Sequence, residues 1–180
     1  PTAEGRLYEV DMRLRPSGKQ GPVATSISAF ADYQRTEAWT WEHLALMRAR
    51  PIAGDADVCA GVAAIRAEVL SQPRDAVTFK ADVAAMRGRI KQAKSGGAPL
   101  DLKDGSGRLQ DIELAAAAAA LFAGSLANTT AEHLADATAA GVLSGTSATT
   151  LGGAHALFLR LRLSTRLVFG ASNLEPGRGE

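Results

Sequence analysis

Cysteine, aromatic residues and long apolar runs are all scarce in this sequence. Cys59 is the only cysteine among 180 residues, so no disulfide can form within the chain. No apolar run reaches the roughly 20 residues that cross a bilayer, and the chain does not begin with a basic segment followed by an apolar one. We therefore expect no membrane partner, and a reducing cytoplasm is the compartment that fits best.

An excess of either charge is also missing. The chain has 20 Lys and Arg residues and 19 Asp and Glu residues, which leaves a net charge of +1. A nucleic-acid binder would need a concentrated basic face, so we expect no nucleic-acid partner. The remaining composition, 46% hydrophobic and 22% charged, is that of a globular protein with a core.

The first 27 residues predict a short β-hairpin. In the stretch EVDMRLRPSG, apolar and charged residues alternate, which is the pattern of a half-buried strand over Leu7 to Arg15. The following prolines and glycines predict a turn and then a short return strand near Val23 to Thr25. A lone hairpin is marginal in water, and the chain starts at Pro1 without a methionine, so we expect a fragment of a longer protein.

Helical periodicity replaces this alternation from residue 28 onward. Four helices are predicted first: residues 28–34, residues 37–50, one capped by Asp55 that ends near Leu70, and one capped by Asp75. The last two carry apolar residues on one face, which is typical of adjacent helices in a bundle.

The second half is also predicted to be helical, after a glycine-rich loop around a short extended piece at Pro99 to Lys103. One helix covers Leu109 to Ala123, where a run of alanines favours close packing, and the next stops at Gly141. The last helix, residues 147–170, is apolar on more than one side, so we expect it to lie centrally. Its arginines are expected to reach outward: Arg160, Arg162 and Arg166.

Histidine and tryptophan give no specific chemical signal. His43, His133 and His155 lie on separate predicted helices without a nearby pattern for a catalytic triad or a metal site, so we interpret them as structural or solvated. Trp39 and Trp41 are explained by packing between the hairpin and the bundle.

The stretch DLKDGSGRLQDIE is a candidate anion site. Lys103 and two glycines come directly before a helix start, where unpaired backbone N–H groups can meet an anion. Asp111 and Glu113 follow in the first turn, where carboxylates also stabilise the helix dipole. From the residues alone, a ligand site and simple helix stabilisation both stay open.

The first strand is the other candidate site. Alternate residues of a strand lie about 6.6 Å apart on one face, so a metal ion held by Asp11 would be within reach of Arg13 and Arg15. A carboxylate beside guanidinium groups suits a nucleoside triphosphate, with Mg²⁺ on the carboxylate and the arginines on phosphate oxygens. A solvated sheet face with paired charges is the alternative. One carboxylate is too few for a two-metal site, so further acids would lie upstream.

Three stretches together resemble one enzyme family. YEVDMRLRPSGKQGPVATS, EAWTWEHLALMRARPIAGD and LDLKDGSGRLQDIE occur here in the order found in the bifunctional glutamine synthetase adenylyltransferase/adenylyl-removing enzymes, over residues 5 to 125. The resemblance implies membership of the nucleotidyltransferase superfamily, with Asp11 as the third metal-binding, catalytic carboxylate. The first two carboxylates and their Gly-Ser turn are absent from this chain.

The resemblance also implies a domain organisation. We expect a mainly α fold, a helical bundle preceded by a short β-hairpin remnant of a nucleotidyltransferase α/β domain. Residues 1–27 would be the C-terminal strands of the catalytic domain, residues 28–172 a helical bundle domain, and residues 173–180 a mobile tail.

The implied activity is transfer of AMP from ATP, with Mg²⁺, to a tyrosine of glutamine synthetase, under control of a PII-type signal protein and glutamine. Arg13, Arg15 and Lys103 would bind the ATP phosphates, and Asp111 and Glu113 would face the site or form an interface. The fragment alone would be inactive because a lone third carboxylate cannot hold both metals. Two alternatives remain: a helical module that docks glutamine synthetase or the PII-type protein, and the related uridylyltransferase that modifies the PII-type protein.

Overall fold

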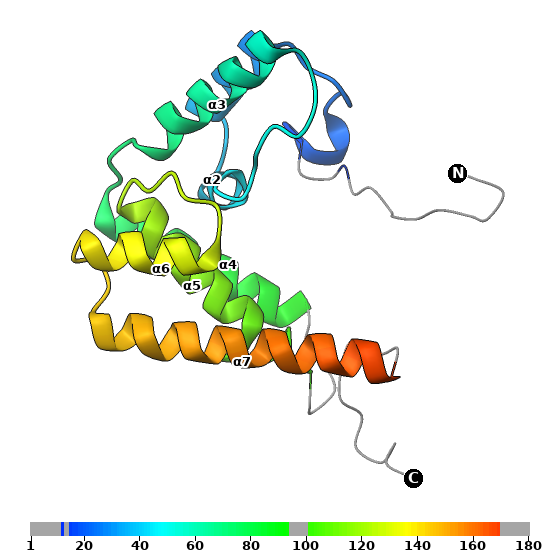
Figure 1. Cartoon of the computed structure of the whole chain (residues 1–180). Coiled ribbons are helices and arrows are strands. Elements are labelled where there is room, and N and C mark those ends of the chain that lie inside the picture. Colours follow the sequence, from blue (N-terminus) through cyan, green and yellow to red (C-terminus); the bar gives the residue numbers. More distant parts are fainter. Residues whose placement is uncertain (1–11, 13–14, 94–100, 170–180) are drawn as a thin grey trace, which may run out of the picture.

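The computed structural model of the chain describes residues 12, 15–93 and 101–169. Within these residues it contains seven α-helices, one 3-10 helix and no strand, so the predicted mainly α class is confirmed (Figure 1). The elements in chain order are η1 (Gly18–Gln20), α1 (Ile27–Thr36), α2 (Thr40–Leu46), α3 (Ala56–Leu70), α4 (Ala76–Ala93), α5 (Leu109–Phe122), α6 (Thr130–Ala139) and α7 (Gly145–Phe169).

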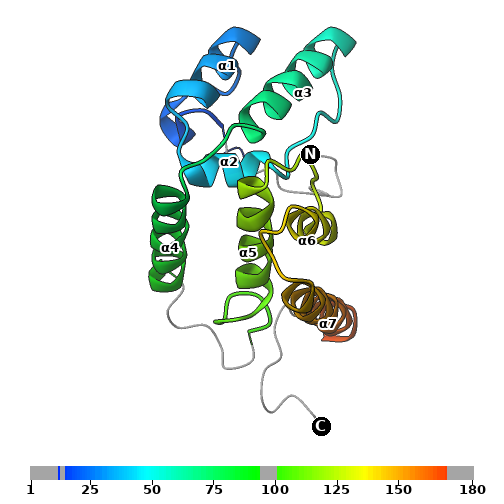
Figure 2. The same ribbon diagram turned by 90° about the vertical axis from the view of Figure 1, so that its left-hand side faces the viewer.

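The helices form a short arm and a bundle that meet at α2. Helices α1 and α3 lie side by side and form the arm, whereas α4 to α7 form the bundle (Figure 1, Figure 2). Helix α2 contacts α3 in the arm and both α4 and α5 in the bundle. Helix α5 is central to the bundle, because it contacts α2, α4, α6 and α7. No helix in the described part of the chain combines the length and apolar character needed to cross a membrane.

One apolar core runs through both parts. Its fully buried side chains include Met47 after α2, Leu70 at the end of α3 and Leu121 on α5. The rings of Phe79 on α4 and Phe122 on α5 pack with their centroids 5.7 Å apart. The core therefore joins the arm to the bundle rather than dividing the chain into separate units.

The alanine run of α5 lies where this helix is covered by its neighbours. Ala116, Ala117, Ala118 and Ala120 are buried. Because alanine has no side chain beyond Cβ, neighbouring backbones can approach α5 closely, and α6 packs along it. The close packing predicted for this run is confirmed.

Side-chain caps begin the helices where the sequence predicts them. Asp55 accepts hydrogen bonds from two backbone N–H groups in the first turn of α3, at 2.9 and 3.3 Å. Asp75 accepts one of 2.9 Å at the start of α4. Thr129 and Glu132 form a capping box at α6, which ends at Ala139 and is followed, as predicted, by Gly141 with φ 72°.

The predicted β-hairpin is not seen in the described residues. The return strand near Val23 to Thr25 is wrong, because residues 21–26 form bends that lead directly into α1, whose N-cap is Ser26. Before it, Ser17 and Gly18 adopt positive φ and the chain closes into η1, and Pro22 has no N–H to give to a ladder. Most of the predicted first strand lies outside the described residues. The whole of the predicted tail lies outside them as well.

Helix α7 does not lie centrally, as predicted, but at an edge of the bundle. It packs on α5 and α6 with one face, and several of its large apolar side chains are exposed. Arg160 and Arg166 are exposed, as predicted. Arg162 is not: it is half-buried, and its Nε has no hydrogen-bond partner among the described residues. The prediction failed because apolar residues on several sides of a helix do not determine how many neighbouring helices cover it.

Candidate functional site

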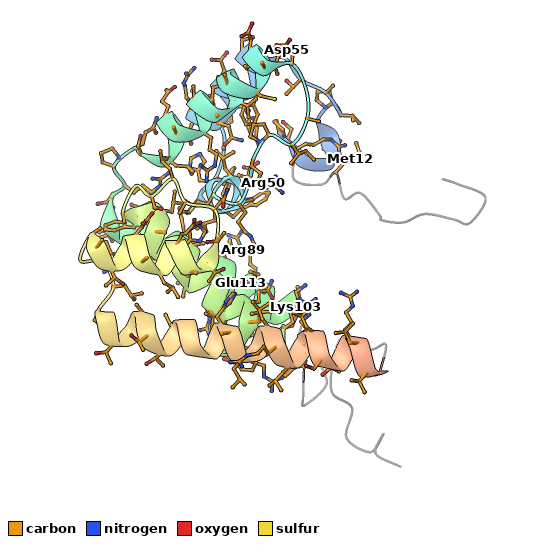
Figure 3. The ribbon with its side chains drawn as sticks, in the orientation of Figure 1. Met12, Arg50, Asp55, Arg89, Lys103 and Glu113 are labelled. Atoms are coloured by element: carbon orange, nitrogen blue, oxygen red, sulfur yellow. The ribbon has the colours of Figure 1, made fainter. Side chains whose placement is uncertain are left out.

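A cleft of about 510 Å³ lies on the arm, between α1, α2 and α3. This volume is within the range of small-molecule sites. Its wall is mainly apolar and includes the aromatic rings of Phe30 and Trp41. Four arginines also line it: Arg15, Arg48, Arg50 (labelled beside α2 in Figure 3) and Arg66. The cleft therefore combines an apolar wall with several guanidinium groups.

Arg15 closes the loop that forms one side of this cleft. Its Nη1 donates to the carbonyl oxygen of Met12 at 2.6 Å, and its Nε donates to that of Gly21 at 3.1 Å. Pro16 lines the cleft beside it. The other two candidates of the predicted strand face, Asp11 and Arg13, lie outside the described residues.

Trp41 and Trp39 differ in their surroundings. Trp41 lines the cleft together with the 15–16 segment, which agrees with the predicted packing between the N-terminal segment and the helices. Trp39 precedes α2 with 64% of its surface exposed.

The loop before α5 is fixed by its own side chains. The Asp101 carboxylate accepts hydrogen bonds from the backbone N–H groups of Lys103, at 2.8 Å, and Asp104, at 3.1 Å. The Arg108 guanidinium donates to the carbonyl oxygen of Asp101. The ammonium group of Lys103 (Figure 3) makes no ion pair within the described residues. This loop presents a lysine on an ordered backbone.

Asp111 joins this loop to α4. Its carboxylate accepts hydrogen bonds from Arg87 Nη2 at 2.6 Å, from Arg87 Nε at 3.1 Å and from the backbone N–H of Gly107 at 2.8 Å. The Arg87 guanidinium is the main reason why the pKa of Asp111 lies below its ordinary value. Asp111 thus orders the start of α5.

Glu113 connects three parts of the fold. Its carboxylate lies 3.3 Å from Nη1 of Arg48, after α2, and 3.6 Å from Nε2 of His155, on α7. Because Arg48 also lines the cleft, Glu113 is linked to the cleft through it. Among the described candidates, Arg15 and Glu113 are thereby related to one cleft, whereas Lys103 and Asp111 belong to the loop before α5.

Arg66 is a cleft residue that the sequence analysis missed. Its guanidinium donates to four carbonyl oxygens at 2.5 to 3.1 Å. Their residues are Leu46, Met47, Leu126 and Ala127. Burial lowers its pKa below the ordinary value. Its hydrogen bonds to the carbonyl groups of Leu46 and Met47 occupy acceptors that could have continued α2. Helix α2 ends at Leu46, whereas the sequence predicted a helix to residue 50. The available signal was the position of Arg66 directly after Ile65, on the apolar side of α3.

Two of the histidines have structural roles. Nε2 of His43 lies 3.0 Å from the carbonyl oxygen of Gln34, and Nε2 of His133 lies 3.2 Å from that of Ala127. Burial lowers the pKa of both imidazoles. In the part of the chain that the structure describes, no group of three His, Cys, Asp or Glu side chains is placed to hold a metal ion. The described residues therefore do not themselves fit a magnesium site.

Two family models match consecutive parts of the chain. Residues 1–65 match the model described as glutamate-ammonia ligase adenylyltransferase. Residues 73–177 match the model described as "Putative nucleotidyltransferase substrate binding domain". The first match includes the cleft-forming arm up to the middle of α3, and the second contains the whole bundle from α4 to α7.

Curated proteins called bifunctional glutamine synthetase adenylyltransferase/adenylyl-removing enzyme are similar to this chain. The protein from Mesorhizobium japonicum is 49% identical over an alignment of 185 positions, and this alignment covers 98% of this chain and 19% of the relative. The protein from Rhizobium meliloti is 57% identical over 123 residues, 68% of this chain and 12% of the relative. The chain thus spans about a fifth or less of the length of these relatives.

Proposed function

Because the chain belongs to the family of bifunctional glutamine synthetase adenylyltransferases and carries a nucleotidyltransferase substrate-binding domain, we propose that it is part of an enzyme that transfers AMP from ATP to a tyrosine of glutamine synthetase. The observation that carries this proposal is the similarity to the Mesorhizobium japonicum protein, which extends over 98% of the chain at 49% identity. Most of the proposed enzyme lies outside this chain, and the chain alone is inactive.

The proposed division of labour follows the order of the elements. Residues 1–27 are the end of the nucleotidyltransferase catalytic domain, including the last strand of its sheet, residues 28–172 are the helical domain, and residues 173–180 are a tail. The position of Arg15 and Pro16 in the wall of the cleft supports this division, because it attaches the end of the catalytic domain directly to α2 and α3. The arm thereby fixes the catalytic strand relative to the bundle.

In this proposal Asp11 is the catalytic carboxylate and metal ligand contributed by this chain. The remaining carboxylates for Mg²⁺ come from the part of the enzyme that precedes it. Arg13, Arg15 and Lys103 bind ATP phosphates, and the half-buried ammonium of Lys103, which makes no ion pair within the described residues, supports its assignment. Such cations stabilise negative charge that develops on the phosphates as AMP moves to the tyrosyl oxygen and pyrophosphate leaves.

In this proposal Asp111 and Glu113 act indirectly, through other side chains of this chain. Their partners are side chains of this chain, Arg87 for Asp111 and Arg48 for Glu113. Asp111 keeps the Lys103 loop against α4, and Glu113 holds Arg48 at the edge of the cleft. These contacts support a role in forming the interface between the helical domain and the catalytic strand.

The proposed partners are glutamine synthetase, as the substrate, and a PII-type signal protein, as the regulator, both in the cytoplasm. The nearly balanced charge supports the expectation that nucleic acid is not a partner. We expect no membrane partner either.

The experiment that tests the proposal is transfer of label from α-³²P-ATP to glutamine synthetase by the full-length enzyme, compared with its Asp11→Asn variant. We expect labelling by the native enzyme and a loss of at least about a hundredfold in the variant, because removal of a metal-binding carboxylate removes transition-state stabilisation. Helical circular dichroism of both proteins controls for folding. Equal labelling by the variant would remove Asp11 from the site, and no labelling by either protein would contradict the proposed activity.

A second candidate function is a docking module without a direct part in catalysis. It is favoured by the match of residues 73–177 to a substrate-binding domain rather than to a catalytic one. If the 180-residue chain binds glutamine synthetase as tightly as the full-length enzyme does, docking is its main contribution. If it does not bind, the catalytic assignment is the better one.

A further inference from the structure

The outer face of α7 carries the largest group of exposed apolar side chains on one described helix. Five of them lie in its second half: Leu157 (52% exposed), Leu161 (38%), Leu163 (59%), Leu167 (86%) and Val168 (69%). At 100° per residue, these five positions fall within a sector of about 160°. Thr165, by contrast, is buried, and it lies about 120° from the middle of this sector. Contiguous exposed apolar surface of this kind marks an interaction site. We define these five residues as the outer face.

Charge distinguishes this face from a generic apolar patch. Helix α7 contains three arginines and no Asp or Glu over its 25 residues. Arg160 projects from the middle of the sector that the outer face occupies, and it makes no ion pair within the described residues. Arg166 is also exposed, but it lies outside that sector, at about 120° from Arg160.

The central Arg160 decides between possible occupants. Two copies of α7 paired through their outer faces would bring like charges together. Insertion into a bilayer would bury a guanidinium among acyl chains. A protein groove with apolar walls and a carboxylate opposite Arg160 satisfies both features, which is the helix-in-groove mode of recognition.

The place of α7 in the fold favours a separate protein over another part of the enzyme. Figure 1 and Figure 2 both show α7 along the edge of the bundle opposite the arm of α1 and α3. Residues 15–20, next to the proposed catalytic domain, belong to the arm side. The outer face of α7 therefore lies away from that attachment point, and α7 belongs to the part of the chain that matches a nucleotidyltransferase substrate-binding domain model.

We propose that the outer face of α7 docks glutamine synthetase, through an apolar groove of that protein that places a carboxylate opposite Arg160. This inference rests on the proposed function and assigns the surface by which the substrate protein is held. It makes α7 a specificity element that acts before AMP transfer. Binding at this face lowers the KM for glutamine synthetase and leaves the reacting groups unchanged.

The test uses the full-length enzyme with two pairs of variants. Leu163→Asp combined with Leu167→Asp places charge on the outer face, and Val77→Asp, at a position of α4 that is 78% exposed, is its control. Arg160→Glu reverses the central charge, and Arg166→Glu makes the same change outside the sector. The readouts are the Kd for immobilised glutamine synthetase and the KM and kcat for label transfer.

We expect the double aspartate variant to raise both Kd and KM for glutamine synthetase at least tenfold, and Arg160→Glu to raise them about fivefold, with kcat and the KM for ATP unchanged. Both control variants should behave as the native enzyme does. An unchanged Kd in the outer-face variants, while the native enzyme labels glutamine synthetase normally, would overturn this inference and leave the proposed function standing. Failure of the native enzyme to label glutamine synthetase would overturn the proposed function, and the inference with it.

Other occupants give distinct results in the same set of proteins. Self-association is measured by light scattering, and membrane binding by sedimentation with vesicles of phosphatidylserine and phosphatidylcholine. Binding of a purified PII-type protein is measured in the same way as binding of glutamine synthetase. Loss of any of these in the double variant, with binding of glutamine synthetase retained, would assign the outer face to that occupant and overturn the proposal.

Discussion

Helices α5 and α7 are both rich in apolar residues, but they are buried to very different extents. Seven of the 14 residues of α5 are buried. In the 25-residue α7, Thr165 is the one buried residue among the described side chains. Helix α5 contacts four other helices, whereas α7 packs on α5 and α6. Side-chain size accompanies this difference, since α5 contributes alanines to its contacts and α7 exposes leucines.

The comparison shows that apolar content alone does not locate a helix in a core. A run of small residues allows neighbours to approach from several sides, so α5 takes the centre although alanine buries little area per residue. Leucines on every side of α7 exceed what two neighbouring helices can cover. Their surplus area is an opportunity for a partner rather than a contribution to the stability of this fold.

The largest expected difference is between two leucine truncations. Leu121→Ala removes a fully buried side chain of α5, so it should lower the free energy of unfolding by about 3 kcal/mol through lost burial and a cavity. Leu167→Ala, at a position of α7 that is 86% exposed, should change it by less than about 0.5 kcal/mol. Urea unfolding of the 180-residue chain measures both. Similar losses in the two variants would mean that α7 is packed in solution and would remove the distinction.

A smaller effect on the free energy of unfolding is expected when the Arg66 guanidinium is removed. Arg66→Met keeps the aliphatic stem but removes the guanidinium from four carbonyl groups, two of them in the connection from α5 to α6, so it should cost about 2 kcal/mol, although the carbonyls of Leu46 and Ala127 keep a second partner. Arg160→Met, on the open side of α7, is the matched control and should cost almost nothing. Thermal and urea unfolding are the measurements. Native-like stability of the Arg66 variant would show that water replaces the guanidinium at these carbonyls.

Local features of the fold could be predicted from the sequence because they depend on neighbours along the chain. Asp55, Asp75 and the Thr129 capping box begin their helices where polar residues precede apolar periodicity. The alanine run was placed correctly for the same reason. The central position predicted for α7 was wrong, because burial depends on which faces meet in space, and the apolar pattern of one helix does not show that.

The candidate site was less accessible to prediction. Lys103, Asp111 and Glu113 could be singled out from the sequence, but their surroundings come from residues far along the chain. Glu113 meets Arg48, 65 positions away, and Asp111 meets Arg87, 24 positions away. Such pairs have no local periodicity, so the sequence alone could not distinguish a ligand site from a tertiary ion pair. The roles of Asp11 and Arg13, outside the described residues, stay predictions.

The smallest expected effect concerns pH and the ion pair that orders the start of α5. Arg87 lowers the pKa of Asp111 in the folded state below its ordinary value of 3.8. The stabilisation is therefore fully present above that value and is lost as the pH falls through the lower, folded pKa. Because Arg87 is 53% exposed, solvent screens the pair and about 1 kcal/mol is the expected size.

The native chain and its Asp111→Asn variant should accordingly differ most above about pH 5 and converge toward pH 2, where the native carboxyl is protonated. The free energy of unfolding from urea titrations between pH 2.5 and 6 measures this. Asp32→Asn on α1, where the carboxylate is 77% exposed, is the matched control and should run parallel to the native chain. A constant offset between the native chain and the Asp111 variant at every pH would mean that Asp111 stabilises α5 through the shape of its side chain rather than through its charge. The order of the Lys103 loop would then not depend on the ion pair with α4.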